Sequence, residues 1–148
     1  MTDLHTTTAL RLLQVADEFR AGLSGEFSAV HGISLNEFLL LLHLERSAAN
    51  RLPRVELARR MHVSASTITR MAAPMEKIGL IDREVDPRDA RLVFVVATNA
   101  GRAKLSEALS TFSKRAGYLF DDRCEGEEVD QFASVLRRLI TGTGDTLA

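Results

Sequence analysis

The stretch 53–101 constrains the fold of this chain more than any other part of it. It begins with two segments of helical apolar spacing, 54–61 and 65–79, which leave only a few residues for a turn between them. Ser64 precedes the second segment, and its hydroxyl can accept hydrogen bonds from the N–H groups exposed at a helix start. Gly79 ends that segment as a left-handed stop. Two helices that cross at a tight turn can place the second helix in the major groove of duplex DNA.

A β-hairpin is predicted directly after this helix pair. Residues 81–85 alternate apolar and polar side chains, and residues 91–97 are rich in β-branched side chains. The turn between them carries Arg88 at its tip, from which a guanidinium can reach phosphate or the neighbouring minor groove. Asp86 can accept from the backbone of the loop or pair with Arg91, and either contact would stiffen the hairpin. Ordinary turn chemistry with self-cancelling charge is the alternative explanation of these residues.

The outward face of the helix 65–79 is chemically suited to duplex DNA. Hydroxyl groups bond phosphates or base edges, and an arginine can bind guanine through two hydrogen bonds. Solvation of an exposed helix face is the simpler explanation when the helix is taken alone, and it is the hairpin that favours DNA. The residues that we expect to contact DNA are Arg54, Ser64, Ser66, Thr67, Thr69, Arg70, Lys77, Arg88 and Arg91.

The same stretch holds an order of residues that is more specific than a bare helix-turn-helix. Its members are Val55–Ala58, Val63–Ser64, Thr67–Arg70, Met75–Ile81, Arg83, Asp86–Arg91 and Thr98–Gly101. With this order the chain resembles the MarR family of winged-helix regulators from Ser34 to about Leu105, and only in architecture outside that range. The resemblance implies a homodimeric transcription regulator whose recognition helix enters the major groove. It also implies that Arg88 reaches the minor groove while Asp86 and Arg91 brace the wing.

Pro74 departs from the pattern of that family, which usually has a polar or basic residue there. A proline inside a helix removes the N–H that would bond the carbonyl of Arg70 and clashes with the preceding turn, at a cost of about 3 kcal/mol. Either the recognition helix is kinked at Pro74, or its base-contacting part ends near Ala73.

Long apolar stripes lie on both sides of the helix pair and hairpin. Residues 4–31 are predicted to form one long helix, and two further helices are predicted within 100–142. Between them, the helix around 38–44 follows a capping box formed by Ser34 and Glu37. This helix is apolar all round, so it must be covered on every side and should be the centre of the fold.

The predicted architecture is mainly α with a small β-hairpin. A winged helix-turn-helix over 34–100 is flanked by helical dimerisation regions over 4–31 and 100–142, within a single domain over 1–148. The terminal stripes exceed what a small core can absorb, which favours a second copy as the partner, with helix pairing inside one chain as the alternative. A two-fold dimer would present two recognition helices roughly 34–36 Å apart, as a pseudo-palindromic operator requires.

Charge is distributed unevenly along a chain whose net charge is −1. Residues 1–50 contain three Lys/Arg and six Asp/Glu, giving −3, and residues 92–148 contain seven and eight, giving −1. Residues 51–91 contain nine and six, giving +3, so the basic region coincides with the helix pair and hairpin. This modest excess predicts binding that weakens readily with salt. The side chains available for phosphates are Arg51, Arg54, Arg59, Arg60, Arg70, Lys77, Arg88 and Arg91.

No group of residues indicates an enzyme, a cofactor or a metal ion. The sequence has no Gly-rich phosphate loop and no Ser-His-Asp order, and its four histidines are scattered without an i, i+4 partner. Cys124 is the single cysteine, which excludes an internal disulfide. Acidic neighbours disfavour its thiolate, so we expect an inert thiol rather than a redox sensor.

A small-molecule effector is a further expected partner. His43 lies on the apolar helix, where it can line a cleft beside the helix pair, although a histidine satisfied within the core is the simpler explanation. The residues of this candidate effector cleft are Phe38, Leu42, His43 and Arg46.

These features favour a sequence-specific DNA-binding regulator, a ligand-responsive homodimeric repressor, over an enzyme. The alternative is a protein-interaction module that uses the winged-helix scaffold without binding DNA, which Pro74 and the near-neutral charge favour. The sequence contains no run of 18 apolar residues and begins without a signal-peptide pattern. We therefore expect a cytoplasmic protein with no membrane partner.

Overall fold

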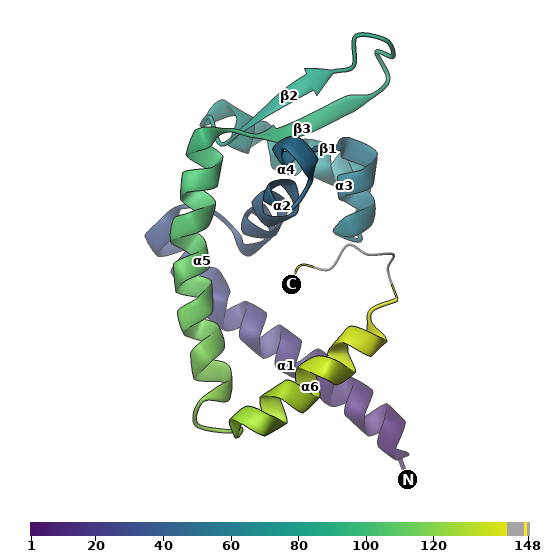
Figure 1. Cartoon of the computed structure of the whole chain (residues 1–148), viewed down its shortest axis with the longest axis vertical. Coiled ribbons are helices and arrows are strands. Elements are labelled where there is room, and N and C mark those ends of the chain that lie inside the picture. Colours follow the sequence, from purple (N-terminus) through teal and green to yellow (C-terminus); the bar gives the residue numbers. More distant parts are fainter. Residues whose placement is uncertain (142–146, 148) are drawn as a thin grey trace.

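The computed structural model describes residues 1–141 and 147 of the 148-residue chain. Its elements are α1 (Leu4–Glu26), a π-helical turn (Phe27–His31), α2 (Leu35–Glu45), a 3₁₀ turn (Ala48–Asn50), β1 (Arg51–Pro53), α3 (Arg54–Arg60), α4 (Ala65–Lys77), β2 (Ile81–Val85), β3 (Val93–Ala97), α5 (Asn99–Phe120) and α6 (Gly126–Leu139). The sheet lies at one end of the molecule beside α2, α3 and α4, while α5 runs down one side to α1 and α6 at the other end (Figure 1). The predicted fold class, mainly helical with a small β component, is confirmed.

The sheet has three strands, whereas the sequence predicts a two-stranded hairpin. β1 pairs antiparallel with β3, opposite β2, and places Leu52 beside Val95. Three residues are too few for an alternating pattern to show, so nothing in the sequence indicates β1. β3 begins at Val93 rather than at Arg91, because Arg91 belongs to the turn.

α2 forms the centre of the hydrophobic core, as its apolar sequence predicts. Seven of its eleven residues are buried, and Leu40 and Leu41 are fully buried. The ring of Phe38 lies 5.0 Å from that of Phe27 and 5.5 Å from that of Phe112, measured between centroids. These contacts join the end of α1 to α5 through α2 and use the large apolar area of aromatic rings.

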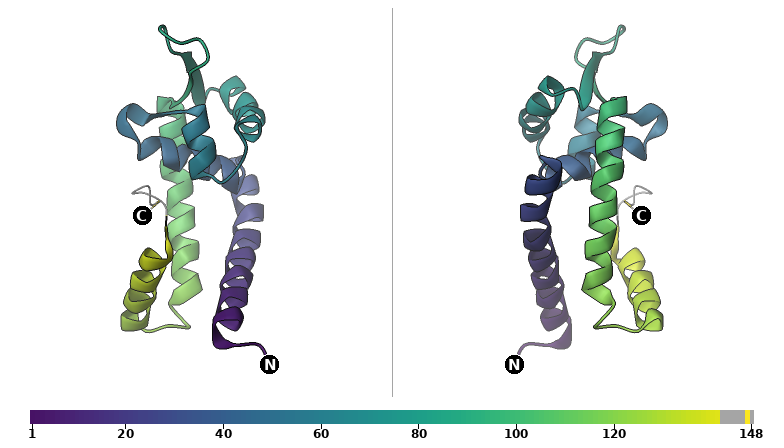
Figure 2. Two further views of the ribbon diagram at one scale, coloured as in Figure 1. Left: turned by 90° about the vertical axis from the view of Figure 1, so that its right-hand side faces the viewer. Right: turned by 90° about the vertical axis from the view of Figure 1, so that its left-hand side faces the viewer.

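α1 and α6 are far less buried. Leu23 is the one buried residue within α1, and no residue within α6 is buried. Figure 2 shows α1, α5 and α6 extending away from the winged-helix unit, which we define as residues 35–97. The apolar stripes of α1 and α6, as predicted, are therefore largely uncovered in a single chain. Residue 142, the predicted end of the second helical region, lies outside the described residues.

Within the described residues, no single helix is both long and apolar enough to cross a membrane. The segments Leu4–His31 and Leu35–Glu45 reach the necessary length and composition only as a pair, which is bent by 81°.

The base of the hairpin meets the start of α5 in a close backbone contact. The N–H of Thr98 donates to the carbonyl of Leu80 at 3.1 Å, and its hydroxyl donates to the carbonyl of Gly79 at 2.6 Å. The same hydroxyl caps α5 by accepting from the N–H of Gly101 at 3.0 Å. A Cβ atom placed on Gly101 would lie 2.0 Å from the carbonyl oxygen of Leu80. Only glycine permits this approach of two backbones.

We expect Gly101→Ala to destabilise the protein by about 3 kcal/mol, because the hairpin and α5 must move apart to admit the methyl group. The measurement is urea unfolding at a fixed protein concentration. Gly25→Ala is the matched control, since a Cβ there meets no atom within 4 Å. The control should leave stability unchanged or raise it by up to about 1 kcal/mol. Equal unfolding midpoints for the two variants would contradict the close contact.

Candidate nucleic-acid interface

α3 and α4 cross at the tight turn that the sequence predicts. Leu57 and Ala58 of α3 are buried, and the N–H of Val63 donates to the carbonyl of Ala58 at 3.0 Å. His62 closes the turn in the left-handed backbone region, with φ of 56°. Residues other than glycine adopt this conformation at a cost in free energy. The turn thus orients α4 so that Ile68 is buried against the core.

The N-terminus of α4 carries a cluster of hydroxyl groups. Ser64 is the N-cap, as predicted, and its Oγ accepts from the N–H of Thr67 at 3.1 Å. The same oxygen lies 2.9 Å from both Ser66 Oγ and Thr67 Oγ1. Arg70 reaches back to Thr67 through a long Nη2–Oγ1 contact of 3.4 Å. Hydroxyls and a guanidinium at the start of an exposed helix are the groups that contact phosphates and base edges.

α4 continues through Pro74 to Lys77, close to the predicted end of the helix at Gly79. The expectation that its base-contacting part ends near Ala73 stays a prediction. Met75, the next residue, is 1% exposed and anchors the last turn in the core. The N–H of Ile78 donates to the carbonyl of Pro74 at 3.2 Å, which closes the helix beyond the proline. Burial on one face of the helix therefore outweighs the hydrogen bond lost on the other.

Arg54 is turned toward α4. Its Nη1 donates to the hydroxyl of Thr69 at 3.2 Å, and that hydroxyl donates to the carbonyl of Ala65 at 3.1 Å. Arg54 Nε is buried and has no hydrogen-bond partner among the described residues. The guanidinium lies in a groove of about 420 Å³ between α3, α4, β2 and β3.

The wing is braced through its backbone. Asp86 Oδ1 accepts from the N–H of Arg88 at 2.7 Å and from that of Asp89 at 3.2 Å, which is the first of the two predicted contacts. The second does not form, because Arg91 pairs with Asp89 at 3.2 Å instead. The side chain of Arg88 is exposed at the tip and has no polar partner within the described chain.

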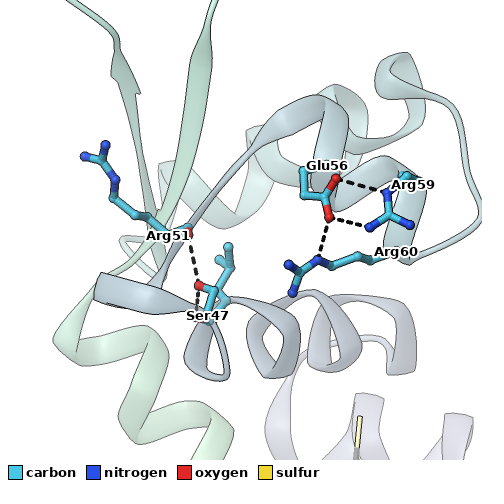
Figure 3. A network of polar contacts seen from close by, with 6 residues as sticks. Ser47, Arg51, Glu56, Arg59 and Arg60 are labelled. Carbon is cyan, nitrogen blue, oxygen red and sulfur yellow. Dashed lines mark hydrogen bonds and ion pairs between the residues drawn. The ribbon is translucent and has the colours of Figure 1, made fainter. Parts of the chain in front are cut away.

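Several basic side chains of the winged-helix unit are engaged by acidic ones. Arg51 pairs with Glu84 at 2.9 Å and lies 4.0 Å above the ring of Phe94. Arg59 and Arg60 both bind Glu56 (Figure 3). Among the residues expected to meet DNA, those without an acidic partner in the described structure are Ser64, Ser66, Thr67, Thr69, Arg54, Arg70, Lys77 and Arg88.

Two ion pairs between elements of the winged-helix unit have no signal in the sequence. Arg83 of β2 pairs with Glu76 of α4 at 2.9 Å and so ties the wing to the recognition helix. Arg51 spans the sheet from β1 to reach Glu84 on β2. Both pairs join residues that become neighbours only after the sheet forms.

Glu56 holds two arginines at once. Its carboxylate accepts from Arg59 Nη2 at 2.6 Å and from Arg60 Nε at 3.0 Å. The hydrogen bonds from Arg59 and then from Arg60 lower the pKa of Glu56 to about 2. The carboxylate therefore remains ionised in the folded protein at pH values where it would be protonated in the unfolded chain.

The residues of the predicted effector cleft are only partly accessible. Phe38, Leu42 and His43 are buried within α2, whereas Arg46 is exposed at the end of that helix. These four residues line neither the groove at Arg54 nor the apolar groove of about 770 Å³ between α1, α5 and α6. The effector cleft stays a prediction.

The described residues contain no group of histidine, cysteine or acidic side chains that could hold a metal ion. Cys124 is exposed and contributes to the rim of the apolar groove between α1, α5 and α6.

Comparison with known proteins gives a consistent picture. The model described as MarR family matches residues 33–93. The HTH-type transcriptional repressor YetL of Bacillus subtilis (strain 168) is 30% identical over 111 residues, which are 74% of this chain and 65% of YetL. The chain thus spans slightly less than two thirds of the length of that curated relative.

Solved structures match almost the whole chain. Sco3205, a MarR family transcriptional regulator from Streptomyces coelicolor in complex with DNA, has a TM-score of 0.81 at 22% identity and covers 94% of this chain and 91% of its own. A probable transcriptional regulator from Pseudomonas aeruginosa has a TM-score of 0.75 at 26% identity, with coverage of 93% and 100%.

We expect Glu56→Gln to lower the free energy of unfolding by about 1 kcal/mol at pH 7, because the amide loses the ionic part of its bonds to the arginines. Since the folded pKa is depressed to about 2 from 4.5, this contribution is complete above pH 4.5 and is lost as the pH falls toward 2. Urea unfolding at pH 7 and pH 3 should therefore show a difference from wild type that narrows in acid. Glu45→Gln, at an exposed position without a recorded ion pair, is the control. A difference independent of pH would refute this role of the carboxylate.

Proposed function

The chain belongs to the MarR family, and we propose that it is a homodimeric, sequence-specific DNA-binding transcription regulator. The observation that carries the proposal is the winged-helix unit, in which α4 exposes Arg70 and Lys77 and the wing exposes Arg88. None of these three side chains has an acidic partner in the described chain, so each is available to a phosphate or a base. The relative in complex with DNA has the same fold.

We infer that α4 contacts base edges in the major groove through the region from Ser64 to Ala73. Arg88 would enter the adjacent minor groove, where a guanidinium is favoured by the negative potential of narrow A·T segments. Asp86 supports that role by holding the loop, since two backbone N–H groups bind its carboxylate. The basic side chains paired with Glu56, Glu84 and Asp89 would contribute less to phosphate binding than those without an acidic partner.

A second copy of the chain would cover the apolar surface of α1, α5 and α6. Leu13 is 64% exposed, Phe132 41% and Leu139 61%, and the groove between these helices holds about 770 Å³. Contiguous apolar surface of this kind marks an interface in a monomer of this size. The proposed domain organisation follows, with the winged helix within 34–100 and dimerisation helices within 4–31 and 100–142.

We further propose that the dimer is a repressor that responds to a small molecule, and not an enzyme. We expect it to act in the cytoplasm. An effector would change DNA affinity only by binding more tightly to a dimer whose recognition helices are wrongly spaced for successive major grooves. YetL carries the description of repressor.

We expect Arg70→Ala and Arg88→Ala each to weaken operator binding by about 5- to 150-fold per half-site, because each removes from each half-site a contact worth about 1–3 kcal/mol. Three cations in each half of a dimer predict a slope of about −5 in log affinity against log salt concentration, and either variant should reduce it by about 2. The measurement is fluorescence anisotropy on the intergenic DNA flanking the gene, located by footprinting. Lys114→Ala, on the exposed surface of α5, is the charge-matched control and should change neither quantity.

Absence of duplex binding by the wild type would support the protein-interaction module instead. Equal affinity of the wild type for the footprinted site and a random duplex at every salt concentration would refute sequence-specific regulation.

We expect Phe132→Asp to convert the dimer to a monomer at micromolar concentration, since a carboxylate on the apolar face of α6 cannot be buried without a partner. Sedimentation velocity measures the change. Glu127→Asp, on the same helix at an exposed position, is the control and should remain dimeric. A wild-type chain that sediments as a monomer would overturn the proposed assembly.

A further inference from the structure

The contact between Arg54 and Thr69 indicates a role for each residue that differs from the predicted one. The sequence predicts that both contact DNA through their polar groups. Arg54 begins α3, but its guanidinium lies in the groove beside α4, with Nε buried and Nη1 bound to Thr69 Oγ1 at 3.2 Å. The groove walls near it are apolar at Ile68, Ala72 and Val95. The guanidinium therefore faces the recognition helix and is not extended toward a phosphate.

The charged residues around the groove leave Arg54 dependent on Thr69. Glu76, the carboxylate that lines the groove, is paired with Arg83 at 2.9 Å. Lys77 lines the same groove and has the same charge as Arg54. The hydroxyl of Thr69 is thus the one recorded hydrogen-bond acceptor of the Arg54 side chain in the described structure.

The hydroxyl of Thr69 is fully used as a donor within the protein. A hydroxyl has one hydrogen, and in Thr69 this hydrogen is directed to the carbonyl of Ala65 at 3.1 Å. Phosphate oxygens, purine N7, guanine O6 and thymine O4 are all acceptors, so each would need a donor from the protein. Thr69 is exposed. With its hydrogen bound to Ala65 and one lone pair bound to Arg54, its hydroxyl retains one lone pair for a base amino group, and its methyl is the other group that it can present to DNA.

We propose that Arg54 is a positioning residue, which holds the Thr69 hydroxyl against the protein so that the Thr69 methyl recognises the C5-methyl of a thymine in the operator. The inference rests on the proposed function and deepens it, because it names one base feature that the recognition helix selects. Contact between a threonine methyl and a thymine methyl is an established means of selecting that base. Arg54 acts here through Thr69 and touches no base itself.

The test uses the full-length protein and its footprinted operator. Each thymine is replaced in turn by deoxyuracil, symmetrically in both half-sites, which removes only the C5-methyl. The wild type should lose about fourfold in affinity per half-site at one position, as expected for loss of one buried methyl-sized group. T69V keeps the methyl and should keep this discrimination, whereas T69S keeps the hydroxyl and should lose it.

Arg54 is tested by the same readout. R54A removes one of the two hydrogen bonds that hold the Thr69 hydroxyl and should reduce the preference for thymine over deoxyuracil, whereas R54K retains a donor for Thr69 and should restore at least half of the lost preference. The free energy of unfolding of each variant is measured in parallel. A loss of stability alone would weaken binding to both operators equally and leave their ratio unchanged.

The outcomes separate this inference from the proposed function. Discrimination by T69S equal to that of the wild type, or a wild type insensitive to deoxyuracil at every position, would overturn the role of Thr69. An unchanged ratio in R54A would overturn the role of Arg54. In each of these cases operator binding by the wild type would still support the proposed function, which fails only if no operator is bound.

Discussion

The close contact between the backbones at Leu80 and Gly101 fixes how the parts that would touch DNA are placed relative to the helices that would join two chains. Leu80 stands between the end of α4 and the start of β2, and Thr98 stands between the end of β3 and the start of α5. Hydrogen bonds among Thr98, Gly79, Leu80 and Gly101 tie these four ends together, with no space for a side chain on Gly101. Because packed elements move as units, a change in the direction of α5 would carry the recognition helix and the wing with it.

The features that could be predicted from the sequence are those whose cause lies within a few residues. The cap at Ser64, the left-handed Gly79 and the turn at Asp86 each depend on a side chain and its immediate neighbours, and the structure has all three. β1 and the pairing of Arg54 with Thr69 could not be predicted in this way. Their partners are 15 or more residues distant along the chain and meet only after the core has formed. The residues expected to contact DNA and the effector cleft stay predictions, since no bound molecule tests them.

Pro74 shows why a local rule can fail in a packed protein. The rule assigns a cost of about 3 kcal/mol to proline inside a helix, and this cost exceeds the intrinsic helix preference of any neighbouring residue. The buried face of α4 supplies Ile68, Ala72 and Met75 to the core, and the last of these comes after the proline. Pro74 itself is exposed, so the carbonyl of Arg70 that it leaves without a backbone donor faces the solvent side of the helix, where water can bind it.

The pairing of charges within the winged-helix unit has a consequence for how such a protein would select DNA. Arg51, Arg59, Arg60 and Arg91 stabilise the unit through acidic partners, so a net excess of basic residues overstates the charge available to phosphates. Binding to any duplex through the phosphates alone would therefore be weak at physiological salt. Discrimination among sequences would then depend on contacts that do not rely on net charge, such as the guanidinium of Arg70 on a guanine and the methyl of Thr69 on a thymine. A chain with a net charge of −1 can thus be a selective DNA-binding protein without being a strong general one.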